Sequence, residues 1–416
     1  MASQGSSFTD GPVTLHFPDI TRVAGETISG YVDLNVAQAQ EDNVEQITVK
    51  FKGTIRCKIT TGSGQSRREH LETLILFNEK LTLWERGTTF PPPGSHILPC
   101  SFQFTLPDTA PPSFHCEAYH RKATISYALE VVGRRPGLFR FNRNIRRPIS
   151  VIPAASQAQL LVTESLRQGW SGRYRNWTNE EKLRQGIWGD YSHARVELKI
   201  PDLASYPIAT AIPFSLHVET DTKPFPISDA PVDKHGKPLF PAPPAISSEV
   251  RLCLVRTTNL RVRRYSRQVN DTFDLKGSVG DATRVAAVHQ ATDEPEWIPA
   301  LGPKDKKGLG TWRRAVHFES AVKIPYTPTT HAEIVDWQYY LRIIIPFPGI
   351  GNDLQLDVPL NLHSSSACPP PPVGVAGSSN TTYADVIPAG PPPPMLDLPP
   401  SYFTGEHHVW DGDEKN

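Results

Sequence analysis

Residues 47–59 read ITVKFKGTIRCKI, and this stretch decides the fold class. Every odd position carries an apolar residue or glycine, and every even position carries threonine, lysine or arginine. Successive side chains of a β-strand point to opposite faces, so a period of two is typical of a strand with one buried and one solvated face. A helix has 3.6 residues per turn and does not produce this pattern.

The same alternation recurs along the chain, with turn sequences such as GSG, PPPG and PD between the runs. Short alternating strands at this spacing favour antiparallel sheets packed as β-sandwiches. Proline supports this, because 41 of the 416 residues are prolines and proline breaks helices. The sequence therefore predicts an all-β fold. The further runs lie at residues 28–36, 102–106, 125–131, 196–200, 212–218 and 354–362.

The spacing of these runs predicts two sandwiches in tandem. We expect a disordered N-terminus at 1–11, a first sandwich at 12–153, a connection at 154–189, a second sandwich with long loops at 190–363 and a tail at 364–416. A short helix is expected in the connection, because Thr178-Asn179-Glu180-Glu181 has the spacing of a capping box and Gly186 suits a helix stop.

The last part of the chain has a different composition. Residues 366–402 hold 11 prolines, and six acidic residues against one lysine follow residue 366. Such a segment cannot bury enough apolar surface to fold, so we expect a disordered, extended, acidic tail.

Composition also bounds the function. The chain carries 43 basic and 43 acidic residues, which argues against a nucleic-acid binder. Its five cysteines never form a C-x-x-C pair, so we expect no disulfide framework, no metal and no cofactor. The first twelve residues lack the apolar core of a signal peptide, and no apolar run approaches the ~20 residues of a membrane helix. A cytoplasmic location follows as an expectation.

Several motifs of the first half occur in an order that is similar to the arrestin N-terminal domain. They are VAGETISGYV at 23–32, VKFKG at 49–53, PGSH at 93–96, FQFTLP at 102–107, PPSF at 111–114 and ISYAL at 125–129. The second half resembles the family more weakly, through VPLNL at 358–362. With its tail, the chain resembles the α-arrestins, the arrestin-related trafficking adaptors.

That resemblance implies two arrestin-like sandwiches and a non-enzymatic adaptor. Such an adaptor works at the plasma membrane or endosomes, where it binds cytosolic tails of membrane transporters or receptors. It recruits a HECT-type ubiquitin ligase through the ligase's WW domains, so that the cargo is ubiquitinated and endocytosed. The first alternative is a non-catalytic scaffold subunit of the retromer type, which shares the arrestin fold. The second is a carbohydrate-active β-sandwich enzyme, which requires two carboxylates flanking a cleft.

The sharpest motif is the P-P-x-Y element in the tail. Prolines in a preformed polyproline II helix lie on an aromatic groove at little entropic cost, and the tyrosine fills a neighbouring pocket. Pro391–Pro394 offers a cruder site of the same kind. The predicted WW-binding residues are Leu398, Pro399, Pro400 and Tyr402.

Two strips of arginines without intervening acids are candidate contacts for cargo or anionic lipid headgroups. Arginine binds carboxylates and phosphates in a bidentate manner, whereas an arginine on a solvated strand face often only pairs with a neighbouring acid. No catalytic motif such as H-E-x-x-H, G-x-S-x-G or a P-loop is present. The candidate residues are Arg140, Arg143, Arg146 and Arg147 in the first strip and Arg251, Arg256, Arg261, Arg263, Arg264 and Arg267 in the second.

Overall fold

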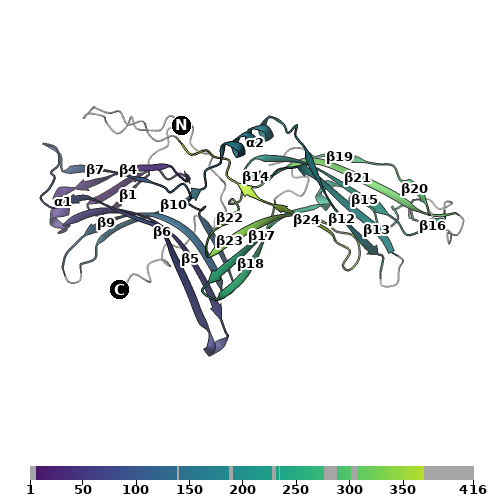
Figure 1. Cartoon of the computed structure of the whole chain (residues 1–416), viewed down its shortest axis with the longest axis horizontal. Coiled ribbons are helices and arrows are strands. Elements are labelled where there is room, and N and C mark those ends of the chain that lie inside the picture. The colour runs from purple at the N-terminus through teal and green to yellow at the C-terminus, as the bar shows by residue number, and fades with distance from the viewer. Residues whose placement is uncertain are drawn as a thin grey trace.

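A computed structural model describes residues 6–137, 140–186, 191–226, 231–233, 235–275, 288–300 and 308–369. The strands form two lobes side by side, with a helix across the junction (Figure 1). We call the strands β1 to β11 with α1 the first lobe, and the strands β12 to β25 the second lobe.

The first lobe is a sandwich of two antiparallel sheets, ordered β1-β2-β4-β7 and β10-β9-β5-β6, with β8 paired to β9. A parallel pair, β3 and β11, lies beside them. The elements are β1 (Ser6–Asp10), β2 (Val13–Phe17), β3 (Arg22–Val23), β4 (Thr27–Asn35), α1 (Val36–Glu41), β5 (Gln46–Thr61), the 3-10 turn η1 (Gly64–Ser66), β6 (Arg68–Glu85), β7 (Ile97–Thr105), β8 (Phe114–Ala118), β9 (Arg121–Arg134), β10 (Arg143–Ile149) and β11 (Val151–Ile152).

The second lobe repeats this plan. Its larger sheet is ordered β12-β13-β15-β21-β16, with β19 and β20 also paired to β21, and its smaller sheet is ordered β18-β17-β23-β22, with β24 on β23. The elements are β12 (Tyr174–Arg184), β13 (Tyr191–Pro201), β14 (Tyr206–Pro207), β15 (Ala211–Asp221), β16 (Phe225–Pro226), η2 (Ser247–Glu249), β17 (Arg251–Val262), β18 (Tyr265–Asp274), β19 (His289–Thr292), β20 (Glu296–Pro299), β21 (Leu309–Lys323), β22 (Thr330–His331), β23 (Val335–Ile345), β24 (Leu354–Leu360) and β25 (Leu362–His363).

The prediction of an all-β fold is confirmed. The deciding stretch forms β5, the strand between β9 and β6. Its odd-numbered apolar side chains are at most 2% exposed and form the core of the first lobe. The other alternating runs fall on β4, β7, β9, β13, β15 and the segment β24–β25.

The prediction of a helix at Thr178–Gly186 is wrong. Residues 174–184 form β12, which pairs with β13 along its whole length, so ladder hydrogen bonds outweigh the local capping signal. The helix of the connection is α2 (Gln157–Gln168), where Ser156 and Gln159 form the capping box. The expected start of the second sandwich at 190 therefore omits its first strand.

Three smaller expectations also need correction. The N-terminus is not wholly irregular, because β1 pairs with β2 from Ser6 onward. The expected long loops contain strands, since β18 extends to Asp274 and both β19 and β20 pair with β21. Residues 364–369, assigned to the tail, are described, and two of them are buried: Ser364 is 2% exposed and Ser366 is 8% exposed. The tail from residue 370 onward lies outside the described residues.

Residues 363–368 form what we call the strap, which returns from the second lobe to the first. Ala155, just before α2, donates its backbone N–H to the Ser366 carbonyl at 2.8 Å. A Cβ added to Gly25 would lie 3.2 Å from the Cys368 sulfur, so the strap ends against the turn between β3 and β4.

Candidate functional site

The predicted WW-binding residues Leu398, Pro399, Pro400 and Tyr402 lie outside the described residues, as does Pro391–Pro394. The motif stays a prediction from sequence.

The first arginine strip lies on and just before β10, and two of its members serve the fold. Arg143 forms ion pairs with Asp42 at 2.7 Å and Asp10 at 3.3 Å, and the hydrogen bond that it donates to Asp42 raises the pKa of Arg143. The guanidinium of Arg147 lies 3.1 Å from the centre of the Phe8 ring. These contacts fasten β1 and α1 to the sheet. Arg140 and Arg146 are exposed.

Half of the second strip is engaged in the same way. Arg251 pairs with Asp274 and Arg261 pairs with Asp336. Arg256 is not a surface residue: it is only 7% exposed and forms an ion pair with Asp271 at 2.6 Å. The prediction that Arg256 contacts cargo is therefore wrong, because its strand position faces the junction between the lobes.

Arg263 and Arg264 remain exposed at the turn between β17 and β18, and Arg267 is exposed on β18. Arg263 has a φ of 52°, a left-handed conformation that is costly for a residue with a side chain. Arg264 donates to the Tyr265 hydroxyl and Arg267 to the Ser266 carbonyl, both within the same hairpin. Among the described residues, no carboxylate pairs with the guanidinium group of any of these three arginines.

The tip of this hairpin rests against the β5–β6 hairpin of the first lobe, and both project from the same side of the molecule (Figure 1). The backbone N–H of Arg263 donates to the Glu72 carboxylate at 2.6 Å. His70 stacks on Tyr265 with ring centroids 4.1 Å apart. Arg121, from β9, donates to the Gln268 carbonyl.

We call this region the paired-hairpin surface. It gathers the arginines of the β17–β18 turn with basic residues of the other hairpin that the sequence analysis missed. Two acids lie beside them. Glu72 accepts from the Arg263 backbone, and Glu69 is engaged by Lys58 at 2.9 Å and by Arg67 at 3.5 Å, where the Lys58 hydrogen bond lowers the pKa of Glu69. The members are Arg67, Arg68, His70, Arg263, Arg264, Tyr265 and Arg267.

This arrangement suits an anionic partner. Exposed guanidinium groups bind phosphate or carboxylate through paired N–H donors, and several together raise the local concentration of anions. The two strips were predicted from runs along the chain. Arg67 and Arg68 are only two consecutive basic residues in the sequence, too few to indicate a basic strip. Only the contact between the two hairpins brings them close to Arg263.

The junction between the lobes is apolar and tightly packed. Phe114 of β8 stacks on Trp337 of β23, with ring centroids 3.9 Å apart and planes 9° apart. Arg256 lies over Phe114, and the Cys57 thiol donates to the Ile334 carbonyl at 3.4 Å. Burial raises the pKa of Cys57 to about 12, so this thiol is protonated and unreactive at neutral pH.

A pocket of about 440 Å³ opens in the second lobe between β12, the loop after β13 and the end of β24. Arg175 lies over the Trp177 ring at its lining, and the buried Trp177 indole N–H has no hydrogen-bond partner. Asp202 is the single carboxylate among the described lining residues. The pocket therefore does not supply the carboxylate pair that the carbohydrate-active alternative requires.

Comparison with known families now adds to this geometry. Residues 12–158 match the family model for the N-terminal domain of arrestin (or S-antigen). The match covers the first lobe from β2 to the start of α2. No curated protein matches the chain. The first lobe is thus similar to the N-terminal domain of arrestins.

Proposed function

We propose that this protein is an adaptor of the α-arrestin type. It brings a WW-domain HECT-type ubiquitin ligase to a membrane transporter or receptor, so that the cargo is ubiquitinated and endocytosed. The adaptor acts in the cytoplasm, peripherally at the plasma membrane or endosomes. It performs no catalysis itself.

One combination of observations carries this proposal: an arrestin-like N-terminal domain and the sequence LPPSY at 398–402 occur in the same chain. The domain supplies a rigid surface for cargo, and the motif supplies a short linear ligand for a WW domain. Within the described residues, no helix has the length and hydrophobicity needed to cross a membrane.

The paired-hairpin surface is the part of the body best suited to cargo. Its arginines come from both lobes, so an acidic cytosolic tail or an anionic headgroup contacts the two lobes at once. Each exposed arginine contributes little by itself, because solvent and salt screen the charge. We therefore assign the binding to the set, not to one residue.

The test is a pull-down of the full-length protein with isolated WW domains of a HECT-type ligase. Pro400→Ala and Tyr402→Ala each remove one of the two groups that enter the groove, so we expect at least about a tenfold loss of affinity from a micromolar starting value. Tyr383→Ala is the matched control, because Tyr383 lies in the tail without preceding prolines.

Equal recovery of Pro400→Ala, Tyr402→Ala and wild type would contradict the ligase-recruiting role. A scaffold subunit of the retromer type predicts a different result: deletion of residues 370–416, which leaves the strap in place, would not affect binding to its partners.

A further inference from the structure

The larger sheet of the second lobe carries a histidine pair on its outer face. In β15 the even-numbered residues 212–220 are buried and the odd-numbered ones point outward. His217 is therefore outward, and it lies directly opposite His317 of β21 in the strand register. Glu197 of β13 lies opposite His217 on the other side.

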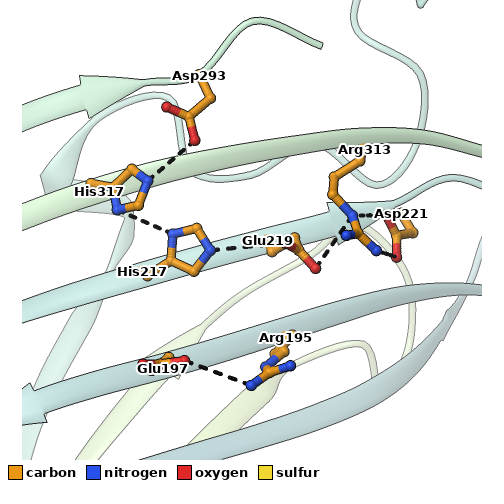
Figure 2. Close-up of polar contacts among 8 residues, drawn as sticks. All are labelled: Arg195, Glu197, His217, Glu219, Asp221, Asp293, Arg313 and His317. Atoms are coloured by element: carbon orange, nitrogen blue, oxygen red, sulfur yellow. Dashed lines mark hydrogen bonds and ion pairs between the residues drawn. The ribbon is translucent and has the colours of Figure 1, made fainter. Parts of the chain in front are cut away.

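The two rings face each other through one nitrogen and face carboxylates through the other (Figure 2). The Nδ1 atoms of His217 and His317 are 3.2 Å apart. The Nε2 atom of His317 is 3.2 Å from an Asp293 oxygen, and the Nε2 atom of His217 is 3.9 Å from a Glu219 oxygen.

Two neutral histidines satisfy the hydrogen bonds here in one arrangement, in which His317 carries its hydrogen on Nε2, toward Asp293, and its Nδ1 accepts from the Nδ1–H of His217. A carboxylate accepts hydrogen bonds only, so it favours the tautomer with the hydrogen on Nε2. With both rings in that tautomer, the two Nδ1 lone pairs face each other with no hydrogen between them. In that state both Nδ1 lone pairs are available to one cation.

We propose that His217 and His317 form a binding site for a divalent transition-metal ion of the zinc type. Two imidazole nitrogens that bind a tetrahedral Zn²⁺ at 2.0–2.1 Å are roughly 3.3 Å from each other, close to the spacing between these two Nδ1 atoms. Asp293 lies behind His317 as carboxylates lie behind metal-binding histidines, and it fixes this ring and its tautomer. Glu219 contributes its charge from 3.9 Å, which is too far for a hydrogen bond.

The surrounding charges favour a cation at this position. Glu197, Glu219, Asp221 and Asp293 lie around the pair, and two arginines balance part of this charge: Arg195 pairs with Glu197, and Arg313 pairs with Glu219 and Asp221.

The site differs from a structural zinc site in two ways. The ring centroids are 4.2 Å apart and the planes are tilted by 30°, so each ring must turn slightly to aim its lone pair at one ion. In the described part of the chain, no three histidine, cysteine, aspartate or glutamate side chains are grouped to hold a metal. Water or a ligand from a partner fills the remaining positions, and binding is weaker than at a four-ligand site.

The test is a zinc chloride titration of the full-length protein against a chromophoric chelator at pH 7.5. The reference protein carries His407→Gln and His408→Gln, which remove the histidines of the tail. We expect one zinc ion per chain in the reference. In that background, His217→Gln and His317→Gln abolish binding, and Asp293→Asn lowers the affinity by roughly 10- to 100-fold.

His193→Gln is the matched control, because His193 lies on the same sheet face and contacts Glu180 instead of a second histidine. We expect this variant to bind zinc like the reference. The proposal is overturned if the reference protein binds no zinc, because the two histidines then share only a proton. It is also overturned if His217→Gln and His193→Gln bind zinc equally. Neither result bears on the WW-domain test.

Discussion

Arg256 illustrates at the scale of one residue how position changes what an arginine does. The sequence analysis placed Arg256 in a basic strip that was predicted to contact cargo or anionic lipid headgroups. In the structure it pairs with Asp271, lies over Phe114 and Phe273, and is 7% exposed. Its role is to join two strands beneath the junction. Arg263, seven positions later, has an exposed side chain because the hairpin turn places it at the tip.

We predict that Arg256→Ala lowers the free energy of unfolding by roughly 3 kcal/mol, because it leaves Asp271 without its partner and uncovers the Phe114 ring. Asp271 remains about a quarter exposed, which keeps the loss at the lower end for a buried pair. Arg342→Ala is the matched control, since Arg342 makes a similar pair with Asp357 in the same sheet but keeps 30% of its side chain exposed. There we expect less than about 1 kcal/mol. Denaturant unfolding measures both, and equal losses would contradict the structural role of Arg256.

At the scale of elements, the alternation of apolar and polar residues predicted the strands well, whereas local capping signals predicted the helix poorly. Apolar residues stand at every second position from Ile47 to Ile59 because one face of the strand is buried. Burial of that face is also what stabilises β5. The capping-box spacing at Thr178 was misleading, because β12 gains its hydrogen bonds from β13, a partner that no local pattern reveals. The true box at Ser156 and Gln159 was in the sequence and was missed.

Contacts between distant residues explain the rest of what sequence could not predict. Phe114 and Trp337 are 223 positions apart, and His217 and His317 are 100 apart. Their meeting depends on strand order and on how the lobes dock, which residue patterns along one chain do not encode. The arginine strips were visible as runs, but not which members face solvent.

The strap gives a prediction about pH. His363 is 6% exposed between β14 and α2, and burial lowers the pKa of its ring while the Gln159 backbone raises it in part. The folded protein therefore resists protonating His363, whereas the unfolded chain takes up the proton near pH 6.5. This contribution to stability is present above about pH 6.5 and is lost as the pH falls below it.

We expect wild type to lose more unfolding free energy between pH 7 and pH 5 than His363→Phe does. Comparing each protein with itself at the two pH values cancels the cost of the new side chain. His96→Phe, at an exposed loop position, is the control and should keep the wild-type pH dependence. An identical pH dependence in wild type and His363→Phe would contradict this role.

At the scale of the whole molecule, the contacts between the two lobes are both apolar and polar. The stacked rings of Phe114 and Trp337 fill the junction, and the hydrogen bond from Arg263 to Glu72 ties the hairpin tips. Any ligand of the paired-hairpin surface therefore meets groups from both lobes at a fixed spacing.

We predict that Phe114→Ala lowers the free energy of unfolding by about 3 kcal/mol and splits the calorimetric unfolding of wild type into two transitions. The cavity forms at the junction, so each lobe then unfolds separately. Phe51→Ala is the control: Phe51 is fully buried inside the first lobe, so its loss should destabilise that lobe without loosening the junction. Small-angle scattering should show a larger radius of gyration for Phe114→Ala only. A single transition with unchanged dimensions would contradict this account.

The hydrogen bond between Ala155 and Ser366 also fixes the point from which the C-terminal tail starts. Because the strap ends beside Gly25, everything after Pro369 starts at the first lobe, next to the junction, and not at the far end of the second lobe. The backbone from Pro369 to Tyr402 spans 33 residues. Whatever path it follows, it reaches at most ~115 Å. A ligase bound at Tyr402 would therefore stay within this distance of the junction between the lobes. Every lysine that it modifies would lie within this distance plus the length of the ligase itself.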